Sequence, residues 1–367
     1  MDLHMHIMQS PPGAETIIDG KRYVYFVGTG YFCLQGHPMV IEASCEASRK
    51  YGIGSATSRV GYGNNPALLD VERLAAEFFD TEDSFYFVSG YCGNGIMAKG
   101  LRDDYDAIFI DSMSHYSILD GIQQANKKSF TFAHCDPEDL SSTLKKNLLP
   151  RERAMVMADG IFPMTGEISP VQDYLKVLDS YPDSSICLDD AHAVGVLGDN
   201  GRGTFEHFSL EGDNLYFSGT LSKAIGGHGG IIPDSKPLLD RIKSASHLYN
   251  GSSPPPVAAA AATAKALEIV MKNPDIRTRL WENTKNVKSG LRSLGLDIED
   301  TNVPIICLDF DNPERMRKIQ QALEKKGIMV AYVEQYGKSG GIIRIAVFSE
   351  HTDEMIEQLI YEISRII

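Results

Sequence analysis

The segment Tyr216–Gly230, YFSGTLSKAIGGHGG, places a single lysine in a setting that suits covalent chemistry. An apolar, strand-like start is followed by small hydroxyl residues, then by Lys223, then by a glycine-rich stretch. A lysine in such a position can act as a nucleophilic amine that links to a carbonyl group. A lone lysine after a strand is also often a solvated surface residue, so the other strand ends decide between the two interpretations.

Polar residues follow several other apolar runs in the same way. Because ligands in open α/β sheets sit at the carboxyl ends of strands, we expect these residues to meet at one edge of a sheet. Each alone is more often structural, as a helix cap, a turn or a core histidine. The expected group consists of Ser89-Gly90-Tyr91 after FYFV, His115 after AIFIDS, Asp159 after AMVMA, Asp189 to His192 after ICL, and Thr220 to Lys223 after LYFSG.

One cofactor, pyridoxal 5′-phosphate (PLP), accounts for these residue types together. It needs a lysine for its Schiff base and a carboxylate that keeps its pyridine nitrogen protonated. Its phosphate needs small hydroxyls and backbone N–H groups near a helix N-terminus. The pattern assigns Lys223 to the Schiff base, Asp189 to the pyridine nitrogen, His192 to the ring hydroxyl, His115 to ring stacking, and Ser89, Gly90 and Thr220 to the phosphate side.

The elements that must position these residues alternate between strands and helices. Helical patterns of about 10–15 residues separate most of the apolar runs, which is typical of βαβ units and a mostly parallel sheet covered on both faces. The expected strands lie at 85–90, 107–112, 130–134, 154–160, 186–190 and 215–219.

The pattern changes after NGSSPPP at 250–256. A long helix at about 257–273 is followed by strands at 304–310, 329–333 and 342–348 and by helices at 313–327 and 352–366, which predicts a smaller α+β unit. We therefore expect an N-terminal segment at 1–40 that pairs with the smaller unit or bridges to the larger one, a large domain at 41–256 and a small domain at 257–367.

Composition limits the class of protein further. The 367 residues include 43% hydrophobic and 23% charged residues, which is typical of a packed globular protein. A formal net charge of −14 argues against nucleic acid or an anionic membrane as a partner. The six cysteines form no CxxC pair, and no secretory signal or long apolar span is evident, so we expect a soluble cytoplasmic protein with free thiols.

With these residues in place, the chain resembles the α-oxoamine synthase family of fold-type I PLP enzymes from about residue 20 to its end. The resemblance implies an α/β fold-type I transferase with a seven-stranded, mostly parallel sheet and a smaller C-terminal α+β domain. The motifs that carry it are GIGSATSRVGYG (52–63), FVSGYCGN (87–94), DSMSHYSILDGI (111–122), DGIFPMTGE (159–167), LDDAHAVGVLGDNGRG (188–203), SGTLSKAIGGHGG (218–230), YNGSSPPP (249–256) and IIRIAVFSEHT (342–352).

The resemblance also implies residue roles and a reaction. Lys223 would shuttle the proton at the substrate α-carbon, and Arg344 would clamp the substrate carboxylate. The family condenses an amino acid with an acyl thioester, carried by CoA or a carrier protein, usually with loss of carbon dioxide, to an α-amino ketone. Further implied positions are Gly90, Tyr91, Ser218 and Thr220 around the cofactor, His115 over its ring, Thr29 on the substrate side, and Ser252 and Ser253, which would reach the phosphate of a neighbouring subunit in a homodimer with shared sites.

Four features depart from the family pattern. Thr29 stands where an asparagine is usual, Leu68 where a histidine is common, and Pro163 where a serine commonly touches the cofactor oxygen. The N-terminal segment is also short. These departures leave an aminotransferase, or related carbanion chemistry without an acyl donor, as the alternative. A third hypothesis is a non-catalytic homologue that binds no cofactor, and the presence of Lys223, Asp189, His192 and Arg344 argues against it.

Overall fold

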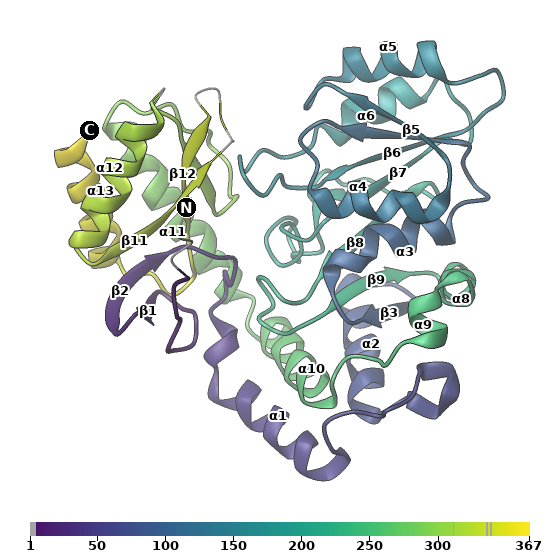
Figure 1. Cartoon of the computed structure of the whole chain (residues 1–367), viewed down its shortest axis with the longest axis horizontal. Coiled ribbons are helices and arrows are strands. Elements are labelled where there is room, and N and C mark those ends of the chain that lie inside the picture. Colours follow the sequence, from purple (N-terminus) through teal and green to yellow (C-terminus); the bar gives the residue numbers. More distant parts are fainter. Residues whose placement is uncertain (1–4, 311, 335–336, 338–339) are drawn as a thin grey trace.

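A seven-stranded sheet forms the centre of the larger part of the molecule (Figure 1). The computed structural model describes residues 5–310, 312–334, 337 and 340–367. The strand order is β3-β9-β8-β7-β6-β4-β5, and β4 to β8 pair in parallel, which confirms the predicted mostly parallel sheet. The strands are β3 (Asp83–Phe87), β4 (Ala107–Asp111), β5 (Lys128–Phe132), β6 (Ala154–Asp159), β7 (Ser185–Asp189), β8 (Leu215–Thr220) and β9 (Gly230–Asp234).

The central strands form because their sequences are apolar without interruption. Every residue of β4, β6 and β7 is buried. Alternate side chains of β4 enter two separate cores: Ile108 and Ile110 pack on one side of the sheet, and Ala107 and Phe109 on the other. A sheet with apolar layers on both faces needs helices on both faces, as the alternation along the sequence indicates.

Strand β9 was not among the predicted strands. It runs antiparallel to both β3 and β8. Its sequence, GIIPD, contains a proline, which removes a backbone donor and argues against a central strand. The structure accommodates Pro233 because β9 pairs with β8 only through Gly230 and Ile231, so the proline lies beyond that ladder.

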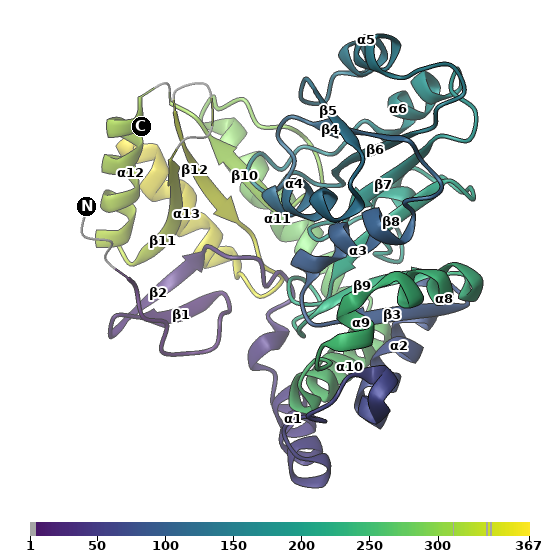
Figure 2. The same ribbon diagram turned by 45° about the vertical axis from the view of Figure 1, so that its right-hand side comes forward.

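Within the described residues, ten α-helices belong to this larger part, and most of them cover the large sheet, whereas α1 lies away from the strands and packs against α10 (Figures 1 and 2). Several begin at a proline behind a capping side chain; Asp136, for example, accepts hydrogen bonds from the backbone of Glu138 and Asp139. The helices are α1 (Pro38–Tyr51), α2 (Pro66–Phe79), α3 (Gly93–Gly100), α4 (Tyr116–Ile122), α5 (Pro137–Asn147), α6 (Val171–Leu178), α7 (Thr204–His207), α8 (Lys236–Ala245), α9 (His247–Gly251) and α10 (Val257–Lys272).

The smaller part contains a five-stranded sheet in the order β1-β2-β11-β12-β10. Strand β2 pairs in parallel with β11, so the N-terminal segment does join the C-terminal unit, as expected. The elements are β1 (Glu15–Ile18), β2 (Lys21–Phe26), β10 (Ile305–Leu308), β11 (Ile328–Glu334), β12 (Gly341–Ala346), α11 (Asp275–Ser293), α12 (Pro313–Lys325) and α13 (Asp353–Ile366).

Helix α10 packs against α1 and α2 on the large sheet's side of the molecule (Figure 2). The domain limits at residues 40 and 256 stay a prediction. None of the helices in the described part of the chain is both long and apolar enough to cross a bilayer.

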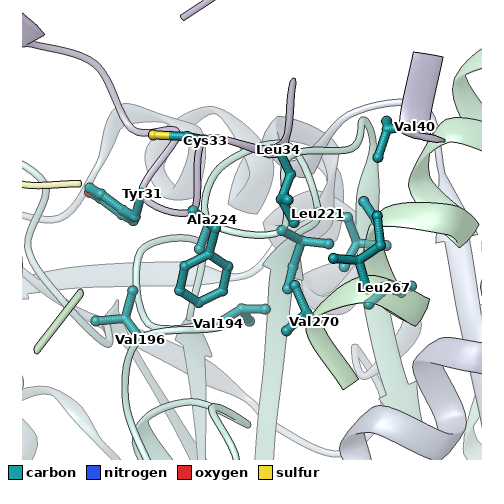
Figure 3. Close-up of a cluster of buried hydrophobic side chains, with 14 of the residues drawn as sticks. Tyr31, Cys33, Leu34, Val40, Val194, Val196, Leu221, Ala224, Leu267 and Val270 are labelled. Carbon is teal, nitrogen blue, oxygen red and sulfur yellow. The ribbon is translucent and has the colours of Figure 1, made fainter. Parts of the chain in front are cut away.

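An apolar cluster joins the N-terminal segment, the loop after β8 and helix α10 (Figure 3). Leu221 and Ala224 lie on either side of Lys223 in the sequence and are fully buried in this cluster, together with Leu34 and Leu267. The cluster therefore fixes the backbone from which Lys223 extends.

Candidate active site

A cavity of about 260 Å³ lies at the carboxyl ends of the parallel strands. It brings together most of the residues that the sequence singled out. Asp159, Ser117, Ala191 and Ser222 line it as well. The predicted residues on its wall are Ser89, Gly90, Tyr91, His115, Asp189, His192, Thr220 and Lys223.

Lys223 follows β8 and is partly buried, with its side chain on the wall of the cavity. Burial, opposed in part by Asp189 and Asp159, lowers its pKa to about 8, because an ammonium is poorly solvated there. Gly226 has a φ of +78°, and a Cβ at that position would lie 2.6 Å from the Cβ of Leu34. A glycine is thus required for the loop to turn back against the N-terminal segment.

Asp189 is the last residue of β7, and its carboxylate is held by three donors. Oδ2 accepts hydrogen bonds from Asn94 Nδ2 at 2.6 Å and Ser117 Oγ at 3.3 Å, and Oδ1 accepts one from the backbone N–H of Ala191 at 3.0 Å. Asn94 and Ser117 are fully buried and were not singled out from the sequence. Asn94 ends the FVSGYCGN motif and is the second residue of α3, so its place in this motif is the sequence signal that could have identified it.

His115 caps α4 at the mouth of the cavity. Its Nδ1 lies 2.7 Å from Ser117 Oγ, and its backbone N–H donates to Asp159 Oδ2 at 2.7 Å. Burial and the nearby Lys223 lower the pKa of the imidazole, although Asp189 opposes them. The ring of Tyr91 meets that of His115 edge to face, with the centroids 6.3 Å apart.

Asp159 has no role in the predicted set beyond its place at a strand end. It is fully enclosed, and burial together with the charge of Asp189 raises its pKa well above the usual range. The backbone N–H of His115 is its hydrogen-bond donor. Asp159 therefore joins β6 to the start of α4 and holds His115 over the cavity.

His192 lies three residues after Asp189 and is 5% exposed. Its Nδ1 lies 2.9 Å from the hydroxyl of Tyr31. Burial, Lys223 and Arg344 lower the pKa of His192 well below its usual value, so the ring is neutral at physiological pH. Tyr31 was not singled out from the sequence, because the contact spans 161 positions in the chain.

Arg344 extends from the middle of β12 in the smaller sheet. Its Nε donates to the carbonyl of Pro163 at 2.8 Å and its Nη1 to the carbonyl of Gly28 at 3.3 Å. It does not line the cavity, but its charge affects Lys223 and His192. Pro163 lacks the hydroxyl of a serine, yet its backbone oxygen holds the arginine, which bridges the two parts of the molecule.

The wall near α3 fits a phosphate ester. Gly90 lies so close to Thr220 that a Cβ would come within 2.7 Å of the Cβ of Thr220. A glycine at this position lets the backbone pack closely against the end of β8, and the hydroxyl-bearing residues Ser89 and Thr220 line the cavity beside it. With the amine of Lys223, the buried carboxylate of Asp189 and two imidazoles on the remaining walls, the donor set fits PLP.

Several predicted residues lie outside the cavity wall. Ser218 is buried beneath α3, where a Cβ on Gly93 would meet its hydroxyl. Thr29 follows Gly28, whose carbonyl binds Arg344. Ser252 and Ser253 lie after α9, where Ser253 is exposed, and their role toward a second subunit stays a prediction. Leu68 is fully buried in α2 and contributes to the apolar core.

Known proteins have a similar fold and a similar sequence. The family described as aminotransferase class I and II matches residues 27–363. The 8-amino-7-oxononanoate synthase 1 of Bacillus velezensis is 32% identical over 358 residues, covering 96% of this chain and 90% of the relative. The enzyme of the same name from Bacillus subtilis strain 168 is 32% identical over 355 residues, with the same coverage.

Solved structures extend the comparison. A serine palmitoyltransferase from Sphingomonas wittichii is 28% identical and aligns over 100% of this chain and 92% of its own, with a TM-score of 0.92. A variant serine palmitoyltransferase from S. paucimobilis, solved with a PLP–myriocin aldimine, is 27% identical over 100% and 93%, with a TM-score of 0.91.

The fold and cavity thus define a fold-type I PLP-dependent transferase. The chain belongs to the class I and II aminotransferase family and, within it, to the α-oxoamine synthases, which condense an amino acid with an acyl thioester.

Proposed function

We propose that this enzyme condenses an α-amino acid with an acyl-CoA and works as a homodimer. We also propose that the reaction depends on Lys223, Asp189, His115, His192 and Arg344. The amino acid loses its carboxyl group as carbon dioxide, the acyl group moves to the α-carbon, and free CoA leaves with its thiol protonated. The observation that carries the proposal is the meeting of Lys223, Asp189, His115 and His192 around one cavity.

When bound, PLP supplies an electron sink for the negative charge that develops at the α-carbon. Asp189 would hold a proton on the pyridine nitrogen, with its carboxylate fixed by Asn94 and Ser117. His115 would cover one face of the ring, and the hydroxyls of Ser89 and Thr220 with the backbone at Gly90 would bind the phosphate. These contacts orient the cofactor before any substrate enters.

Lys223 would hold the cofactor covalently and then move a proton at the substrate α-carbon. Its lowered pKa, about 8, leaves a useful fraction of the amine neutral near physiological pH. The apolar neighbours Leu221 and Ala224 restrict its backbone, so the amine returns to the same place after each transfer.

Arg344 would bind the substrate carboxylate. Its Nη1 makes only a long contact of 3.3 Å with Gly28, whereas its Nε is firmly held by Pro163. The terminal amino groups can therefore turn to an incoming carboxylate while the side chain keeps its direction.

A substrate panel tests this function. The purified holoenzyme is mixed with glycine, alanine or serine and with acyl-CoAs of short chains, a seven-carbon dicarboxylic chain or a long saturated chain, while thiol release and cofactor absorbance are followed. Two of these acyl chains follow from the names of similar proteins. The seven-carbon dicarboxylic chain corresponds to 8-amino-7-oxononanoate synthase, and the long saturated chain corresponds to serine palmitoyltransferase. We expect one pair to release thiol and carbon dioxide in equal amounts.

Conversion of the cofactor to its amine form by an amino acid, with no thiol released by any donor, would contradict the proposal and indicate an aminotransferase.

Within the panel, Arg344→Ala should raise the amino-acid concentration needed for half-maximal rate while PLP binding is kept. Arg365→Ala, on the exposed end of α13, is the matched control.

A further inference from the structure

The contact between Tyr31 and His192 has no role in the reaction proposed above. The hydroxyl of Tyr31 lies 2.9 Å from His192 Nδ1, and the two side chains are 0% and 5% exposed. The other nitrogen of His192, Nε2, belongs to a ring that lines the cofactor cavity. The direction of the hydrogen bond with Tyr31 decides which ring nitrogen of the neutral His192 carries the proton. It therefore decides whether Nε2 donates or accepts a hydrogen bond in the cavity.

The acceptors available to the Tyr31 hydroxyl decide the direction of this hydrogen bond. Among the described residues its hydrogen-bond partner is His192 Nδ1, and the nearby guanidinium of Arg344 offers no acceptor because it can only donate. If His192 Nδ1 also donated to Tyr31, the hydroxyl proton would have no acceptor in a fully buried site, which is costly. The favourable arrangement therefore has the hydroxyl donating to Nδ1, which leaves the proton of the neutral ring on Nε2.

We infer that Tyr31 is a positioning residue that fixes His192 in the tautomer with its proton on Nε2, so that this nitrogen donates to the ring oxygen of the cofactor. The inference rests on the proposed role of His192. Tyr31 comes from the segment between β2 and α1, so the chain that leads out of the smaller sheet sets a hydrogen-bond donor on the wall of the cavity.

The first test reads the tautomer directly. Nitrogen-15 NMR of histidine-labelled wild-type holoenzyme, with the His192 signals assigned by their loss in His192→Ala, distinguishes a protonated from an unprotonated Nδ1. We expect an unprotonated Nδ1 and a protonated Nε2 throughout pH 6–9. A proton on Nδ1 would overturn the inference without any variant of Tyr31.

The second test follows the absorbance of bound PLP against pH. A donor on the ring oxygen draws negative charge away from the neighbouring Lys223 linkage, so losing the donor makes that linkage hold its proton to higher pH. We expect Tyr31→Phe to raise the midpoint by about one pH unit, in the direction of His192→Ala. Tyr25→Phe is the matched control, because Tyr25 is also buried near Arg344 but does not contact His192.

The outcomes separate the two claims. If His192→Ala shifts the midpoint and Tyr31→Phe does not, the inference is overturned while the role of His192 stands. If neither shifts it, the proposed role of His192 fails, and the inference fails with it. An equal shift in Tyr25→Phe would assign the effect to repacking around Arg344 and would also overturn the inference.

Discussion

At the scale of single residues, the amine of Lys223 is the feature with the most direct chemical consequence. Burial disfavours its charged form and lowers its pKa to about 8. Only the neutral amine can attack the aldehyde of PLP. The rate at which the cofactor-free enzyme captures PLP should therefore rise with pH, with a midpoint near 8, and level off above it.

Stopped-flow absorbance after mixing with PLP between pH 6.5 and 9.5 measures this rate. Lys223→Ala should show no covalent capture at any pH, and borohydride reduction followed by peptide mass spectrometry should place the label on Lys223. A midpoint near that of an ordinary lysine, or a label on another lysine, would contradict the assignment.

Asn94 is a second residue whose chemistry is open to measurement. It donates a 2.6 Å hydrogen bond to the carboxylate of Asp189 and is fully buried. Hydrogen bonds to charged groups contribute about 1.5–3 kcal/mol, so Asn94→Ala should weaken PLP binding roughly tenfold or more. A fluorescence titration of the cofactor-free protein gives the Kd. Asn147→Ala, which removes a contact to the Thr143 carbonyl in α5, should leave it unchanged; equal Kd values for both variants would contradict the role of Asn94.

At the scale of elements, much of the architecture could be predicted because continuous apolar runs mark buried parallel strands. The strands holding Phe109, Val156 and Leu188 were found within two residues of their ends. Strand β9 was not predicted, and Pro233 argues against a central strand there. The strand tolerates the proline because its ladder with β8 includes only Gly230 and Ile231. Local pattern cannot show which ladder a residue joins.

The residues of the cavity also divide into those that could be predicted from the sequence and those that could not. Lys223, Asp189 and His115 could be predicted because each lies at or within a few residues after the end of a strand of the parallel sheet, where ligands bind. Tyr31, Asn94 and Ser117 could not be placed from strand ends, because they act through contacts with residues 161, 95 and 72 positions away. Such contacts depend on how the elements pack.

The hairpin at 161–168, which carries Pro163, is tied to the large sheet by a partly buried histidine. His134 Nδ1 lies 2.8 Å from Asp111 Oδ1, and its Nε2 lies 3.0 Å from Glu167 Oε2. Although burial opposes the charge, these carboxylates raise the pKa of His134 to about 12. The folded pKa lies above the unfolded value near 6.5, so the contribution to stability is complete below pH 6.5 and falls as the pH rises toward 12.

His134→Gln should therefore lower the Tm by a few degrees at pH 6 and by less at pH 9. Differential scanning calorimetry of the holoenzyme at the two pH values measures the loss. His247→Gln, at an exposed position in α9, is the control. A loss that stays constant or grows with pH would show that the charge of His134 does not hold the hairpin.

At the scale of the whole molecule, the two sheets meet through Arg344, and the open side of the cavity carries apolar groups. Tyr91, Tyr116 and Leu119 are 42%, 58% and 45% exposed, and they lie on or next to α4. Exposed apolar side chains gathered at a cavity mouth are typical of an interface. They support the proposed homodimer, in which Ser252 and Ser253 of one subunit complete the phosphate site of the other.

Mixed dimers test this sharing. Lys223→Ala removes the amine, and a Ser252→Asp, Ser253→Asp double variant places negative charge against the phosphate. If the sites are shared, a mixed dimer has one site with an intact lysine and intact serines, because each comes from a different chain. Random reassociation of equal amounts should then restore about a quarter of wild-type activity. Light scattering establishes that the proteins are dimers, and each variant alone is the control. Dimers that exchange subunits without regaining activity would show that each chain builds its phosphate site alone.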